Sequence, residues 1–119
     1  ASYARSIYPQ KRVLRPSDVS FASICAKEAA CREAQIHYLK IIEDIETTPE
    51  LLTTLTAYLL DHESSMANTA KALCCHINTI KYRLNSIRDN TGYSPSKPAD
   101  VYPLLIAVAI NRMKNSENE

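Results

Sequence analysis

The chain has 119 residues, of which 45% are apolar, and a formal net charge of only +1. This length supports one apolar core, so we expect a single domain. The chain has one glycine, too few for the turns of a sheet protein, and we predict an all-α fold built as a multi-helix bundle.

The charges are spread unevenly along the chain. Residues 1–16 carry four basic and no acidic side chains, residues 17–63 carry a net charge of −6, and residues 64–119 carry +3. The middle would repel a polyanion and both ends would attract it. The small total charge is therefore compatible with a local DNA-binding face.

Several functional classes have no support in the sequence. No apolar run approaches the roughly 20 residues that span a bilayer, and the first residues lack the charged-then-apolar order of a signal peptide, so we expect a soluble, cytoplasmic protein without a membrane partner. Adjacent Cys74 and Cys75 cannot easily bridge each other, and no second histidine stands at ligand spacing from His76, so we expect no metal and no cofactor. Paired carboxylates around a histidine, a glycine-rich phosphate loop and a nucleophile near a base are all missing, which argues against an enzyme.

The first 16 residues resemble the end of a preceding domain followed by a linker. An apolar helical face is expected within residues 1–8, and residues 12–15 are typical of a short extended strand. Because a lone strand leaves an unpaired edge, we expect it either to pair with a second copy or to be poorly ordered.

Three helical patterns precede the central motif. One opens at Pro16 with Ser17 or Asp18 as its cap, a second joins it without a clear breaker near residues 29–31 and runs to Ile45, and a third opens at Pro49 after a Thr48 cap. We expect Tyr58 and His62 to be a core tyrosine and a solvated histidine. The third helix leads directly into residues 65–91.

Residues 65–91 predict a helix-turn-helix. Ser65 is the expected N-cap, Ala70 is small where two helices cross, and Cys74 stands where the chain reverses and a left-handed backbone is needed. Cys75 is expected to fill the turn as a buried apolar side chain. Thr91 and the only glycine, Gly92, end the second helix.

The second helix is amphipathic. Its apolar residues fall within an arc of about 80°, and polar side chains occupy the opposite side with Lys81 and Arg83 on the flanks. Such a face suits the major groove, because amides read adenine edges and flanking cations reach phosphates. The alternative is a merely solvated face. The apolar stripe is Ile77, Ile80, Leu84 and Ile87.

A stiff loop and one more helix complete the chain. Asp100 is the expected cap of the last helix, with Pro103 in its first turn. We expect this helix to brace the outside of the helix-turn-helix, the domain to run from 17 to 115, and residues 116–119 to form a disordered tail.

The motif at residues 76–84, His-x-Asn-Thr-Ile-x-Tyr-Arg-Leu, together with Thr91-Gly92, resembles the C-terminal domain of PucR/CdaR-type bacterial transcription regulators, whose helix-turn-helix is similar to that of Fis. The resemblance implies DNA binding as a homodimer, control of genes for uptake or catabolism of a small metabolite, and effector sensing in upstream domains. Residues 1–16 would then join an upstream GGDEF-like domain. Ile77 departs from the family's usual arginine, and it would either contact a thymine methyl or join the core.

Ten residues are therefore candidates for contact with double-stranded DNA: Ser65, Lys71, His76, Asn78, Thr79, Lys81, Tyr82, Arg83, Asn85 and Arg88. The competing hypothesis is a helix-turn-helix fold that serves only for dimerisation or protein docking. Ile77 and the acidic segment 17–63 favour that alternative.

Overall fold

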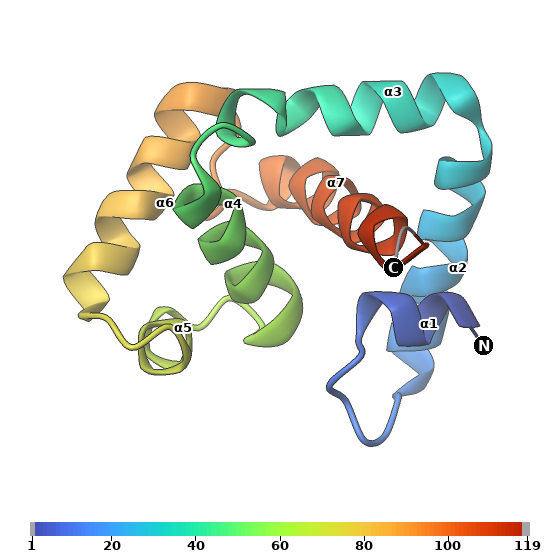
Figure 1. The fold of residues 1–119 in the computed structure, drawn as a ribbon, viewed down its shortest axis with the longest axis horizontal. Coiled ribbons are helices and arrows are strands. Elements are labelled where there is room, and N and C mark those ends of the chain that lie inside the picture. The colour runs from blue at the N-terminus through green and yellow to red at the C-terminus, as the bar shows by residue number, and fades with distance from the viewer. Residues whose placement is uncertain (1, 118–119) are drawn as a thin grey trace.

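A computed structural model describes residues 2–117 of the chain, and within this range every regular element is helical (Figure 1). The all-α prediction is confirmed. The helices are α1 (Ser2–Ile7), α2 (Pro16–Ala30), α3 (Arg32–Ile41), α4 (Pro49–Thr56), α5 (Met66–Ala72), α6 (Ile77–Thr91) and α7 (Pro98–Glu117). A 3-10 turn, η1 (Glu43–Ile45), follows α3, and a π-helical segment, η2 (Ala57–Asp61), continues α4.

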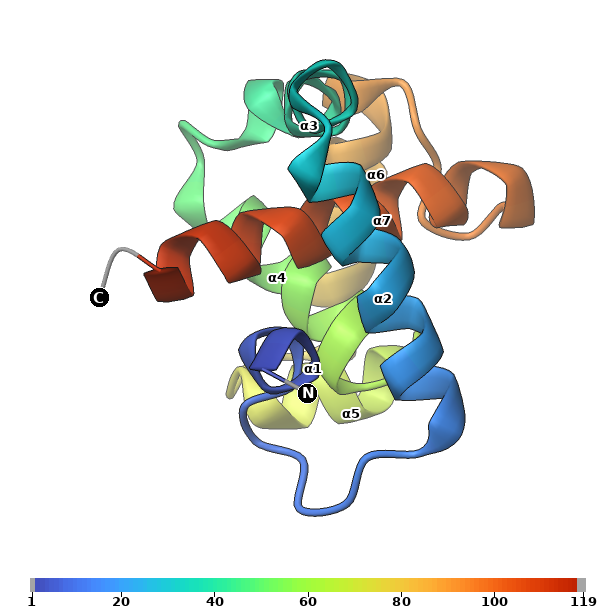
Figure 2. The ribbon, with the colours of Figure 1, turned by 90° about the vertical axis from the view of Figure 1, so that its right-hand side faces the viewer.

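Helix α7 is the centre of the fold. It runs between α4 on one side and α2 and α3 on the other, and α1 packs across it (Figures 1 and 2). All residues from Ile106 to Ile110 are fully buried, so the helix is covered on every side. The prediction that α7 braces the outside of the helix-turn-helix is wrong, because its apolar residues surround the helix and its main neighbours are α3, α1, α2 and α4.

The two ends of α7 also differ from expectation. The helix begins at Pro98, so Asp100 lies in its first turn, where its Oδ2 accepts a hydrogen bond from the Ser94 amide at 3.0 Å. Pro103 lies inside the helix rather than in its first turn. The helix continues through residue 117, so the predicted tail is helical at 116 and 117, while 118 and 119 lie outside the described residues.

The N-terminal segment belongs to the same core as the rest of the helices. Ala4, Ile7 and Tyr8 are buried where α1 meets α2 and α7. The predicted strand at residues 12–15 is wrong: these residues form a loop, Val13 is 78% exposed, and no strand exists in the described range for them to pair with. Whether residues 1–16 adjoin an upstream domain stays a prediction.

Asp18 anchors the loop to α2. Its carboxylate is buried, accepts the Arg15 amide at 2.9 Å and pairs with Lys11 Nζ at 3.0 Å. Burial alone raises the pKa of Asp18, but these two donors outweigh it, and the net pKa is lowered from its ordinary value. The predicted start of α2 at Pro16 is confirmed, but the N-cap is Arg15 rather than Ser17 or Asp18, and the Asp18 carboxylate reaches back three residues to the N-cap amide.

Helix α4 begins at Pro49, but the predicted Thr48 side-chain cap is wrong, since that hydroxyl makes no capping bond.

The segment between α4 and α5 contains irregular backbone. In η2 the His62 amide bonds to the Ala57 carbonyl at 2.9 Å, five residues back, and Glu63 and Ser64 then take positive φ angles of 47° and 63°. These turns aim the chain into α5.

One arginine ties this segment to both ends of the chain. Arg112 of α7 holds the two carboxylate oxygens of Asp61 at 2.7 and 2.9 Å, and the same guanidinium donates to the Ile7 carbonyl at 3.1 Å. The end of α1, the end of η2 and the C-terminal half of α7 therefore meet at a single side chain.

Candidate nucleic-acid interface

The turn after α5 is a Schellman motif. The Cys74 amide bonds to the Lys71 carbonyl at 3.3 Å, and the Cys75 amide to the Ala70 carbonyl at 3.0 Å. Cys74 has φ 55°, the left-handed conformation for which glycine is the usual residue. The predicted reversal at Cys74 is confirmed. Cys75 is only half-buried, although it does pack against the core as expected.

Both helices of the motif have side-chain caps at their N-termini. The Ser65 hydroxyl accepts the Asn68 amide at 3.1 Å, which confirms the predicted cap of α5. His76 caps α6, because its Nδ1 accepts the Asn78 amide at 3.0 Å. In this neutral tautomer the ring proton is on Nε2, so the exposed His76 side chain presents a donor.

The inner face of α6 matches the predicted stripe. Ile80 and Ile87 are fully buried and Leu84 nearly so, and α6 packs against α4, α5 and η1. Ile77 is half-buried and packs against the same core. Of its two predicted roles, the structure favours the core contact over an exposed thymine-methyl contact.

The outer face of α6 is polar and accessible. Asn78, Lys81, Asn85 and Arg88 are exposed, and Tyr82 is 72% exposed. These side chains extend over three turns, a length of about 15 Å at 1.5 Å per residue. Arg88 pairs only with its neighbour Asp89 at 3.3 Å, an exposed contact that stabilises little.

Arg83 differs from these outer-face residues because its side chain contacts α4. Its Nη1 donates to the Thr54 hydroxyl of α4 at 3.2 Å, while that hydroxyl donates to the Glu50 carbonyl at 2.6 Å. Thr54 is fully buried. Sequence reasoning missed Thr54 because its partner lies 29 positions away on another helix, and a threonine in a helix gives no sign of such a partner.

The remaining predicted positions lie at the edges of the interface. Lys71 is exposed on α5, Thr79 is half-buried in the first turn of α6, and Ser65 is half-buried at the start of α5. Eight of the ten candidates thus lie at the N-cap or within the length of α6, and two lie on or beside α5.

Other classes of site find no support in the described residues. No group of three potential metal ligands occurs within residues 2–117. All four cysteines are free: Cys25 is buried, Cys75 half-buried, and Cys31 and Cys74 exposed. In the same range no helix is long and apolar enough to cross a membrane.

Two helices joined by a tight turn, with a buried stripe and an exposed polar face on the second, define a helix-turn-helix domain, a class that places its second helix in the major groove of DNA. The family model described as the PucR C-terminal helix-turn-helix domain matches residues 51–110. The chain belongs to this family, which is regulatory rather than enzymatic.

Curated relatives are mycobacterial. The uncharacterized proteins Rv2242 and MT2302 of Mycobacterium tuberculosis and Mb2266 of Mycobacterium bovis are each 40% identical to the chain over 65 residues. This match covers 55% of the chain but only 16% of each relative, so the chain matches about a sixth of their length. No solved structure matches the chain.

Proposed function

We propose that this chain is the DNA-binding part of a sequence-specific transcription regulator. The exposed polar face of α6, opposite its buried stripe, is the observation that carries the proposal. The family to which the chain belongs supports it independently.

The residues divide into two roles in this proposal. Asn78, Tyr82 and Asn85 face bases, since an amide can bond adenine at two positions and the three side chains share the outer face of α6. The cations on and near α6 contact phosphates, and Arg83 has enough guanidinium donors to keep Thr54 and still reach a phosphate. The phosphate contacts are assigned to Ser65, Lys71, His76, Thr79, Lys81, Arg83 and Arg88.

Binding as a homodimer to two half-sites is part of the proposal, as is action in the cytoplasm on genes for uptake or catabolism of a small metabolite. An effector would be sensed by upstream domains. The greater length of the curated relatives is compatible with further domains in a full-length regulator.

Binding to promoter fragments, followed by fluorescence anisotropy over a salt series, tests the proposal. We expect affinity to fall as salt rises, because phosphate contacts release counterions. Asn78→Ala should lose about 1–3 kcal/mol of discrimination between sequences, whereas Lys81→Ala should weaken all sequences alike and reduce the salt slope by about one.

Two matched substitutions outside α6 control for general effects. Asn115→Ala on α7 and Lys40→Ala on α3 also alter exposed residues, and both should leave binding unchanged. Absence of any salt-dependent affinity would refute the proposal.

The second candidate, a docking or dimerisation module without DNA reading, is supported by the exposed acidic residues Glu43, Asp44 and Glu46 at η1. Exposure of Ile77 would also favour it, but Ile77 is half-buried. A wild-type chain that dimerises without binding any DNA fragment would favour this candidate over the first.

A further inference from the structure

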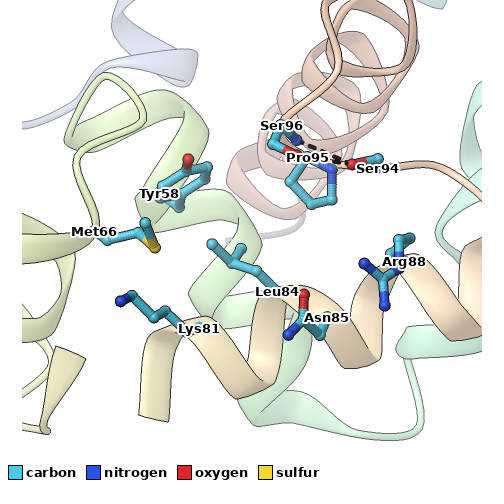
Figure 3. Close-up of a pocket in the computed structure, with 9 residues that line it drawn as sticks. All are labelled: Tyr58, Met66, Lys81, Leu84, Asn85, Arg88, Ser94, Pro95 and Ser96. Carbon is cyan, nitrogen blue, oxygen red and sulfur yellow. Dashed lines mark hydrogen bonds between the residues drawn. The ribbon is translucent and has the colours of Figure 1, made fainter. Parts of the chain in front are cut away.

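A cleft of about 260 Å³ lies along one flank of α6, at the edge of its outer polar face (Figure 3). Lys81, Leu84, Asn85 and Arg88 of α6 form one wall. Across the cleft lie Tyr58 of η2, Met66 of α5 and the loop that precedes α7. The loop contributes Ser94, Pro95 and Ser96 to the lining.

The charges of the cleft point to an anion. Lys81 and Arg88 lie two helical turns apart, about 10.5 Å along the axis, and none of the nine described residues that line the cleft is acidic. Lys81 forms no ion pair or hydrogen bond within residues 2–117, and Arg88 has only its exposed contact with Asp89. Two cations without a strong partner therefore flank one opening.

Tyr58 contributes a ring and an accessible hydroxyl to the lining of the cleft. The residue is only 6% exposed, yet its hydroxyl has no hydrogen-bond partner within the described residues. Every fully enclosed side-chain oxygen in that range has a hydrogen-bond partner. The Tyr58 hydroxyl has none, so it must lie in the exposed part of the residue. Solvent or a ligand in the cleft can therefore supply the partner of this hydroxyl.

The floor of the cleft is apolar. Leu84, Met66, Pro95 and the Tyr58 ring provide flat and sulfur-containing surfaces that suit an aromatic ring. A phosphate diester of DNA has no aromatic ring to pack on this apolar surface. The volume is below the roughly 300–1,000 Å³ of sites for drug-sized molecules, so the ligand has about one ring.

We propose that this cleft binds a small aromatic monocarboxylate, with its ring on the apolar floor and its carboxylate between Lys81, Arg88 and Asn85. The site goes beyond the proposed function and does not depend on it, because it can be tested on the free protein. Since Lys81 and Arg88 also lie on the proposed DNA-binding helix, an occupied cleft would weaken DNA binding by neutralising their charges.

Two-dimensional NMR of the chain during titration with benzoate tests the site. We expect saturable shifts confined to amides around the cleft, with a Kd on the order of 1 mM or lower. Benzamide, which has the same ring without the charge, and inorganic phosphate, which has the charge without the ring, should each bind at least about tenfold more weakly.

Substitutions then assign the contacts. Lys81→Met and Tyr58→Phe should each weaken benzoate binding, the first by roughly tenfold, which is the loss expected for one charge-assisted hydrogen bond. Lys40→Met removes an exposed cation of α3 outside the cleft and should leave the Kd unchanged. Each variant's amide spectrum reports whether it is folded.

Four results would overturn the proposal: no saturable shift with benzoate, equal binding of benzamide, equal binding of phosphate, or equal losses from Lys81→Met and Lys40→Met. Failure of the chain to bind DNA would leave the benzoate titration unaffected, so the two proposals fail separately. If benzoate binds as expected, adding it should also raise the Kd for a promoter fragment.

Discussion

The turn of the helix-turn-helix carries a strained residue, and its relief should stabilise the protein. Cys74 has φ 55°, where a side chain costs roughly 1–2 kcal/mol. Cys74→Gly removes that strain but gives the unfolded chain more freedom, which offsets about 0.4–1 kcal/mol. The exposed thiol forms no buried contact that would be lost. We therefore expect a net gain of about 0.5–1 kcal/mol in the free energy of unfolding.

Urea denaturation followed by circular dichroism measures this gain in the free energy of unfolding. In thermal denaturation the same gain should raise the midpoint temperature by about 2–4 °C for a chain of this size. Cys74→Ala is the matched control, because it removes the thiol and keeps a Cβ in the same backbone conformation. It should change stability by less than about 0.5 kcal/mol. If Cys74→Gly destabilises the chain, or if Cys74→Ala stabilises it equally, backbone strain at this turn is not the cause.

Three further outcomes are expected. Arg83→Ala should lower the free energy of unfolding by about 1 kcal/mol by removing a partly buried charged donor, and a double-mutant cycle with Thr54→Val in urea denaturation should show coupling between the two residues. Asp18→Asn should cost about 1–2 kcal/mol at neutral pH. Because the pKa of Asp18 is lowered on folding, its contribution is present above the unfolded value of about 3.9, so the stability difference from the wild type in a pH series of denaturation curves should shrink as pH falls below that value. Burial raises the pKa of the Cys25 thiol to about 12, and mass spectrometry after iodoacetamide treatment should find Cys25 alkylated only when the chain is unfolded; rapid alkylation of Cys25 in the native protein would contradict its placement.

Local chemistry made the helix-turn-helix predictable. The Ser65 cap, the reversal at Cys74 and the end of α6 at Gly92 each depend on residues within a few positions of one another. The stripe from Ile77 to Ile87 needed only the helical period. These features are confirmed because no distant partner decides them.

Some errors are local, the absent Thr48 cap and the start of α7 at Pro98 among them, and the others concern long-range packing. The last helix was interpreted from one apolar face, although its uninterrupted apolar run at residues 104–110 is typical of a helix buried on all sides. Residues 12–15 have a strand-like composition but no neighbouring strand to pair with in the described range. The π-helical bond from His62 to Ala57 and the contact of Arg83 with Thr54 depend on three-dimensional surroundings that no local pattern encodes.

Because Ile7 is buried under α7, the folded core extends beyond the residues that identify the family. The family is identified on residues 51–110, yet Ile7, Cys25 and Ile42 are fully buried in the same core and lie before that range. A graft of residues 51–110 into another protein would include α6, but it would leave uncovered the side of α7 that α1, α2 and α3 pack against. A transplanted domain that keeps its shape therefore has to begin at α1.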